Sequence, residues 1–142
     1  MADDDVTRGY RDIPEEDRKK ANAFFEQGRQ LVERAQYDYS ITLYLNGLEK
    51  DPENVDAHQA LREVSLKRKV SGGKPLGMKE TWALKTNTSD DKANLLAAEK
   101  LLAYDPGNLE WIAAAIRHAD AAGLMATKQW FFEIYSAAGQ SR

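Results

Sequence analysis

Apolar residues recur along most of the chain at the three- and four-residue spacing that is typical of helices. Between residues 14 and 35 the apolar side chains fall at Phe24, Phe25, Leu31, Val32 and Ala35, with polar residues between them. A second stripe follows almost at once, at Tyr37, Ile41, Tyr44, Leu45 and Leu48. No segment shows the strict alternation of a half-buried strand. The pattern therefore predicts an all-α fold.

Turn and capping residues divide this pattern into six helices. The predicted helices begin near Pro14, after Gln36, at Val55, after the capping segment 88–91, at Leu109 and near Met125, and the last four of them end near Lys69, Tyr104, Ala122 and Ala138. Between the third and fourth, residues 70–88 contain the glycines and the proline of a loop, with one or two helical turns possible in "MKETWAL". The other connections are short, and short connections place neighbouring helices antiparallel. Three antiparallel helix pairs are expected.

One turn is spelled almost identically twice, as "DPEN" at residues 51–54 and "DPGN" at 105–108. Each proline cannot continue the preceding helix, and each asparagine can cap the amides of the next one. We predict that both turns have the same role, which is to join the second helix of one pair to the first helix of the next.

The first helix pair resembles a tetratricopeptide repeat, whose period is about 34 residues. With Ala21 as the first position, the landmark positions 4, 8, 11, 24 and 32 of that family hold Phe24, Gly28, Leu31, Tyr44 and Pro52. Ser40 and Gly47 stand where the family has small residues that let two helices approach closely. The resemblance is close over residues 21–54, and over 55–138 it holds by phase only.

The resemblance implies an α-α superhelix of about three antiparallel pairs, TPR-like, with a loop inserted in the second pair. From Pro52 to Pro106 is 106 − 52 = 54 residues, about 20 more than the family period, and the segment 70–88 accounts for the excess. The implied domain organisation is an acidic tail at 1–13, a helical domain at 14–138 with the insert 70–88, and a short tail at 139–142. The alternative is a plain helical bundle in which the two turns are alike by coincidence.

Members of the family bind partners in a concave groove lined by the first helix of each pair. Mapped onto this chain, the lining positions of that groove are Asn22, Phe25, Arg29, Val32, Glu33, Asp56, Gln59, Glu63, Leu66, Lys67, Glu110, Ala113, Arg117, Asp120 and Ala121. The candidate contact residues among them are Asn22, Phe25, Arg29, Gln59, Glu63, Lys67 and Arg117. Phe25 is a candidate apolar anchor and Arg29 a candidate carboxylate contact, unless each simply packs against a neighbouring helix. The resemblance thus implies a scaffold or interaction module that binds a protein or peptide.

The charge balance does not mark the whole chain as a nucleic-acid or membrane binder. Its 142 residues include 20 basic and 23 acidic side chains, for a net charge of −3. One window is basic, however, through Arg62, Lys67, Arg68, Lys69, Lys74, Lys79 and Lys85. Segment 62–85 therefore offers an alternative function, anion or nucleic-acid binding, although a solvated lysine-rich loop also explains it.

Candidate catalytic chemistry is sparse. The chain has no cysteine, and its two histidines, His58 and His118, are far apart and outside any metal-ligand spacing. No catalytic signature surrounds the serines. We therefore expect no metal, no cofactor and no enzymatic activity. The N-terminus lacks a secretion signal and no apolar run reaches membrane-spanning length, so a cytoplasmic protein without membrane association is the expectation.

The aromatic residues of two segments lead to two further expectations. The last helix carries Trp130, Phe131, Phe132, Ile134 and Tyr135, which point nearly all round it. A homodimer through this helix is therefore predicted, unless further repeats follow in the natural protein or the helix lies deeper in the fold. In the insert, Met78 and Trp82 are four residues apart, and we expect both to dock on the helical layer.

Overall fold

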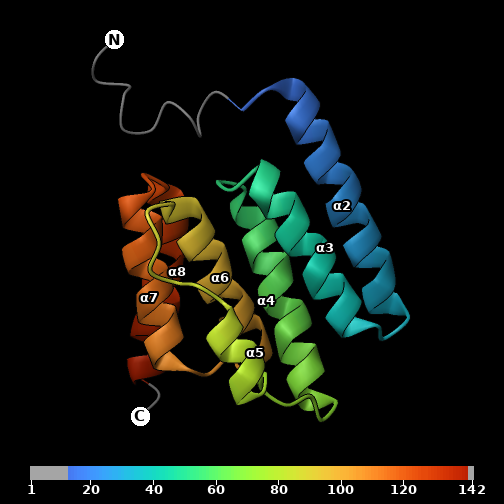
Figure 1. The fold of residues 1–142 in the computed structure, drawn as a ribbon. Coiled ribbons are helices and arrows are strands. Elements are labelled where there is room, and N and C mark those ends of the chain that lie inside the picture. Colours follow the sequence, from blue (N-terminus) through green and yellow to red (C-terminus); the bar gives the residue numbers. More distant parts are fainter. Residues whose placement is uncertain (1–12, 141–142) are drawn as a thin grey trace.

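The computed structural model describes residues 13–140, and within them it contains seven α-helices and no strand. In chain order these are α2 (Glu15–Glu33), α3 (Tyr37–Lys50), α4 (Val55–Val70), α5 (Met78–Ala83), α6 (Asp91–Tyr104), α7 (Leu109–Ala121) and α8 (Met125–Gln140). Figure 1 shows the helices side by side, with α2 at one edge and α7 and α8 at the other. The prediction of an all-α fold is confirmed.

Six of these helices are the predicted ones, and the seventh, α5, lies in the segment predicted as a loop. The C-terminal helix α8 continues to Gln140, so the predicted tail 139–142 begins inside a helix. The predicted acidic tail 1–13 lies outside the described residues except for Ile13, as do residues 141 and 142.

The two similar turns have the same local structure. Asn54 accepts a hydrogen bond from the backbone amide of Ala57 at 3.1 Å, and Asn108 accepts one from Trp111 at 3.2 Å. Each asparagine amide also donates to the aspartate three residues before it, at 3.3 Å in the first turn and 3.1 Å in the second. Both prolines are buried. The shared spelling therefore encodes one turn that ends a helix and caps the next.

Helices α2 and α3 approach closely because small residues lie where they cross. A methyl group added at Gly28 would lie 2.8 Å from the ring of Tyr44, and one added at Gly47 would overlap the ring of Phe25. The Ser40 hydroxyl donates to the carbonyl oxygen of Gly28 at 2.8 Å, which satisfies a buried polar group at the crossing. The prediction that these small positions allow close packing is confirmed.

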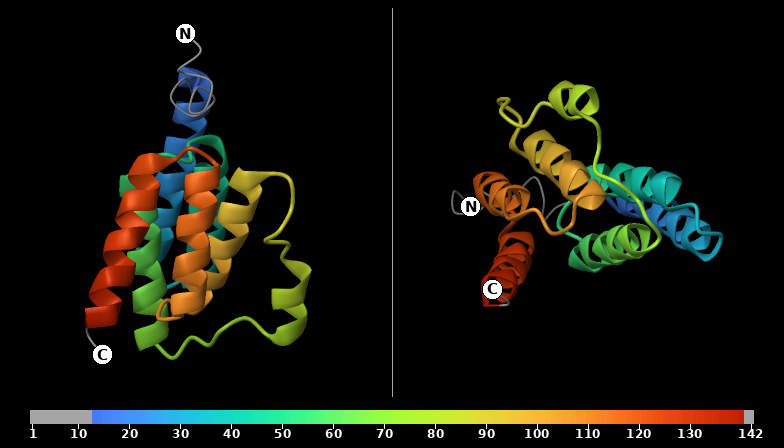
Figure 2. Two further views of the ribbon diagram at one scale, coloured as in Figure 1. Left: turned by 90° about the vertical axis from the view of Figure 1, so that its left-hand side faces the viewer. Right: turned by 90° about the horizontal axis from the view of Figure 1, so that it is seen from below.

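The apolar interior forms two neighbouring clusters. One lies mainly between α3 and α4 and includes Ile41, Tyr44, Leu48, Ala57, Leu61, Val64 and Ala103. The other lies among α6, α7 and α8 and includes Leu95, Leu102, Ile112, Ala115, Ala119, Ala122, Leu124 and Phe131. Helix α6 contributes to both, since it packs against α3, α4 and α7. Figure 2 shows these helices gathered into one body, with α5 outside it.

The C-terminal helix packs deeper than a terminal helix of a linear stack. It contacts α4 as well as α7, and the side chain of Phe131 is only 1% exposed inside the chain's own core. Trp130 and Ile134 are partly buried against the same cluster, whereas Phe132 and Tyr135 are 51% and 39% exposed. The expected apolar surface is therefore reduced, because α4 covers one side of α8 and α7 another.

The predicted docking of Met78 and Trp82 is wrong. Both residues of α5 are exposed, at 75% and 77% respectively. The segment is fastened by other means at its C-terminal end, where Thr88 and the buried Asn94 of α6 exchange hydrogen bonds of 2.9 Å through backbone and side-chain groups. The partly buried apolar residues of the segment are Leu76 and Leu84, so α5 itself is left facing solvent.

Candidate functional site: a groove between α2 and α4

An open groove of about 370 Å³ runs between α2 and α4, with α3 beneath it. Helix α2 and helix α4 supply its two walls, and the end of the first DPxN turn closes it. The lining residues are Asn22, Phe25, Glu26, Arg29, Tyr44, Asn54, Asp56, Ala57 and Ala60. A concave surface with an apolar floor and a few polar side chains is typical of a ligand-binding site.

Two aromatic rings form the apolar floor of the groove. The rings of Phe25 and Tyr44 are stacked, with centroids 5.9 Å apart and planes inclined by 20°. Phe25 is partly buried because Gly47 leaves room for its ring, and Tyr44 is buried beneath it. Ala57 and Ala60 on α4 add small apolar side chains opposite. This floor is fixed by the packing of α2 on α3, so it exists without a partner.

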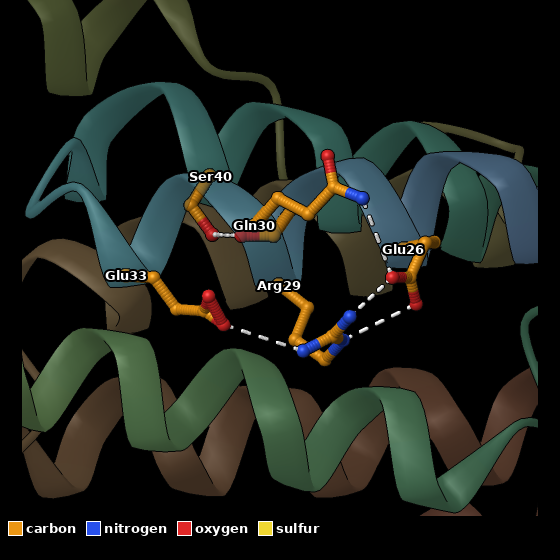
Figure 3. Close-up of polar contacts among 6 residues, drawn as sticks. Glu26, Arg29, Gln30, Glu33 and Ser40 are labelled. Carbon is orange, nitrogen blue, oxygen red and sulfur yellow. Dashed lines mark hydrogen bonds and ion pairs between the residues drawn. The ribbon is translucent and has the colours of Figure 1, made fainter.

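The one cation in the lining is already paired. The Arg29 guanidinium lies over the groove between α2 and α4 and donates to Glu26, one helical turn earlier, through two nitrogens (Figure 3). Its Nη1 also lies 3.4 Å from a carboxylate oxygen of Glu33. Hydrogen bonding with Glu26 accordingly raises the pKa of Arg29 and lowers that of Glu26. Arg29 therefore has two carboxylates of its own helix around it.

The acidic residue Glu63 also acts on the groove. The pKa of Tyr44 is raised, chiefly by burial, and the negative charges of Glu26 and Glu63 raise it further while Arg29 opposes them. Glu63 lies seven residues after Asp56 on α4, so the two share one face of that helix. Within the described residues, neither Asp56 nor Glu63 has an ion-pair partner.

The structure brings together only some of the groove residues predicted from the sequence. Asn22, Phe25, Arg29 and Asp56 line the groove, and the charge of Glu63 acts on Tyr44 in its floor. The predicted residues Gln59, Lys67 and Arg117 are exposed, but they are not part of its lining. Lys67 instead borders a separate shallow hollow, with Tyr37, Leu66, Val70 and Ser71.

Sequence reasoning missed two lining residues, Glu26 and Ala60, whereas Asp56 was among the predicted ones. Ala60 directly follows the predicted residue Gln59 on α4, and Glu26 directly follows the predicted Phe25 on α2. Their positions next to predicted groove residues on the same helices could have indicated that they line the groove. The role of Tyr44 was not available in this way, because it reaches the groove from α3 through the gap left by Gly28.

Two members of the predicted basic segment 62–85, Arg62 and Arg68, are partly buried. Arg68 donates to Asp38 at 2.6 Å, and its guanidinium carbon lies 4.4 Å from the centroid of the Tyr104 ring. Arg62 is partly buried, and burial lowers its pKa. The exposed members are Lys67, Lys69, Lys74, Lys79 and Lys85. An anion would therefore meet lysines only, spread over α4, α5 and their connections.

A buried cluster of ionisable groups around His58 and Glu99 is closed to ligands. His58 is fully buried, with Nδ1 at 2.7 Å from Glu99 Oε2 and Nε2 at 2.8 Å from the carbonyl oxygen of Pro52. The adjoining cavity has a volume of only about 10 Å³, room for about one water molecule, and Arg62 is among its lining residues. The cluster joins α4 to α6, and we interpret it as structural.

Comparison of the chain with protein-family models, with curated proteins and with solved structures found no match. In the described part of the chain, no group of three or more histidine, aspartate or glutamate residues is placed to hold a metal ion. None of the helices between residues 13 and 140 is long and apolar enough to cross a bilayer. The function of the groove must therefore be inferred from its geometry and chemistry alone.

Proposed function

We propose that this chain is a non-catalytic interaction module, which binds a peptide or an extended segment of another protein in the groove between α2 and α4. The observation that carries the proposal is the groove itself, about 370 Å³ in volume, open, and floored by the stacked rings of Phe25 and Tyr44. Such a preformed floor lowers the cost of binding, because little has to be ordered when the partner arrives.

The finer architecture belongs to the same proposal. We interpret the pairs α2–α3, α4–α6 and α7–α8 as three TPR-like units, the second of them interrupted by the segment that holds α5. The equal geometry of the two DPxN turns and the close crossing at Gly28 and Ser40 support this interpretation. In such an array the groove lies between the first helices of the first two units.

A peptide selection tests the proposal. The protein would be immobilised and exposed to a library of random dodecapeptides displayed on phage, and the enriched peptides would be synthesised with a fluorescent label. We expect Ala60→Arg to abolish their binding, since a long side chain at this position fills the groove. The matched control Ala126→Arg, at an exposed position of α8, should bind as the parent does. Peptides that bind equally well to Ala60→Arg would overturn the proposed site.

A separate titration tests the alternative, which is binding of anions or nucleic acid through segment 62–85. A labelled single-stranded oligonucleotide would be titrated against the parent protein and against a variant with Lys74, Lys79 and Lys85 changed to glutamine. Tight binding that falls steeply with salt and depends on these lysines would favour the alternative. We expect no such binding, because the exposed lysines are dispersed.

A further inference from the structure

The charges around the groove specify the kind of segment that fits it. Of the charged residues that line it, Glu26 and Asp56 are acidic and Arg29 is the cation. Glu33 pairs with Arg29 from α2, and Glu63 lies on the same face of α4 as Asp56, seven residues later. Because Arg29 is shared by two carboxylates of α2 and no other cation is among the lining residues, the lining offers no unpaired cation to an incoming carboxylate. An acidic partner would find repulsion on both walls.

The two walls differ in how their charge is arranged. On α2, Glu26 and Glu33 are both paired with Arg29, as Figure 3 shows, so that wall presents a fixed network with one more negative than positive charge. On α4, Asp56 and Glu63 are exposed and without an ion-pair partner among the described residues. Ala57 and Ala60 lie between them in sequence, and their small side chains leave room in the groove. The α4 wall is thus two carboxylates flanking a small apolar surface, opposite the Phe25 ring.

We propose, building on the function proposed above, that the groove recognises a basic segment: a stretch with one apolar side chain flanked by lysine or arginine. The apolar side chain would lie on Phe25 and the two alanines, and the flanking cations would meet Asp56 and Glu63. Residues 56 and 63 are two helical turns apart, so about 10 Å of α4 separates them. An extended segment spans that distance in about three residues, which sets the spacing of the two cations.

The geometry also explains why Arg29 is not the recognition residue. A guanidinium that already donates to two carboxylates gains little from a third. Its role in this proposal is to keep Glu26 and Glu33 from repelling each other, and so to hold the α2 wall in a defined arrangement. Specificity for charge then comes from α4, where neither carboxylate has an ion-pair partner between residues 13 and 140.

Two labelled dodecapeptides with the same leucine and serine residues test this inference, one with four lysines and the other with four glutamates at matched positions. At low salt we expect the lysine peptide to bind about tenfold or more tightly than the glutamate peptide, since two partly screened carboxylates each contribute a modest amount. The double variant Asp56→Lys/Glu63→Lys should reverse this order. The control Glu49→Lys/Glu110→Lys changes the net charge equally at exposed positions outside the groove, and it should keep the order of the parent.

The outcomes separate this inference from the function on which it rests. If the phage selection yields neutral or acidic peptides that Ala60→Arg excludes, the groove is a binding site and the basic specificity is wrong. If the control variant reverses the order as effectively as the groove variant, the preference comes from net charge and the inference is also wrong. If no selected peptide depends on Ala60, the proposed function fails, and the inference fails with it.

Discussion

The Nδ1 atom of His58 lies 2.7 Å from Oε2 of Glu99, and this fully buried pair joins α4 to α6. The other ring nitrogen faces the Pro52 carbonyl oxygen, so both partners of the imidazole are hydrogen-bond acceptors. Only the doubly protonated imidazolium can donate to both. Burial by itself lowers the pKa of His58, but the charge and hydrogen bond of Glu99 and the Pro52 carbonyl outweigh it and raise the pKa.

This raised pKa makes the stability of the fold depend on pH. A histidine whose pKa is higher in the folded than in the unfolded state stabilises the fold fully below its unfolded value of about 6.5, and the stabilisation is lost as pH rises through the folded value. We expect the free energy of unfolding to fall between pH 6.5 and pH 9, by at most about 1.4 kcal/mol per pH unit. Urea unfolding at a series of pH values measures this.

The variant His58→Gln is the control, since it should unfold with a free energy nearly independent of pH over the same range. His118 does not confuse the result. Burial and the neighbouring Arg117 lower its pKa. Its effect on the free energy of unfolding therefore has the opposite sign, and it occurs only at pH values below about 6.5. A parent protein whose stability is constant or rises from pH 6.5 to 9 would contradict the protonation state assigned to His58.

Breaking the buried pair should cost more than replacing it. We expect His58→Leu to destabilise the protein by about 3–5 kcal/mol, because it leaves the Glu99 carboxylate buried without its partner. The double variant His58→Leu/Glu99→Leu removes both charges and should recover much of that loss. Chemical denaturation of the single and double variants measures the coupling. Additive losses in the double variant would show that the pair does not act as a unit.

The helices and turns could be predicted from the sequence because local signals determine them. Pro52 and Pro106 end helices, and Asn54 and Asn108 begin them, through contacts with residues no more than four positions away. The close crossing of α2 and α3 was also predictable, since it depends on a glycine and a serine twelve residues apart. Signals of this range are visible in the order of residues alone.

The contacts of α8 and of α6 with α4, and the pairing of Arg29 in the groove, were not predictable in this way. The His58–Glu99 pair spans 41 residues, and the Thr127 hydroxyl donates to Glu53, 74 residues away, at 2.9 Å. Nothing local indicates that these residues meet. The pairing of Arg29 within its own helix has spacings of three and four residues, yet the sequence offered no reason to prefer Glu26 and Glu33 over a carboxylate of the partner.

The equivalence of the two turns predicts equal energetic effects. Asn54→Ala and Asn108→Ala each remove one helix cap, and we expect each to lower the free energy of unfolding by about 1 kcal/mol. Asn46→Ala, at an exposed position inside α3, is the matched control and should be neutral or slightly stabilising, since alanine favours a helix. Thermal unfolding followed by circular dichroism compares the three. A loss at one turn only would show that the similar geometry hides different roles.

The structure redirects the expected homodimer to a narrower surface of α8. Any pairing of two copies through this helix must use the exposed Phe132 and Tyr135, because Phe131 is enclosed by the chain's own core. We expect sedimentation equilibrium to show association at high concentration that Phe132→Glu abolishes while the variant stays folded. Phe131→Glu should unfold the second core cluster instead, since it buries a carboxylate without a partner. A monomer at every concentration would contradict the dimer.

Two aromatic residues on different helices should differ sharply in their contribution to stability. Phe131 is 1% exposed and packs in the cluster of α6, α7 and α8, whereas Trp82 on α5 is 77% exposed. We expect Phe131→Ala to cost about 3–5 kcal/mol, because it loses burial and leaves a cavity. Trp82→Ala should change the free energy of unfolding by no more than about 0.5 kcal/mol. Urea unfolding followed by circular dichroism measures both, and a loss of more than about 1 kcal/mol for Trp82→Ala would show that this ring packs on the protein in solution.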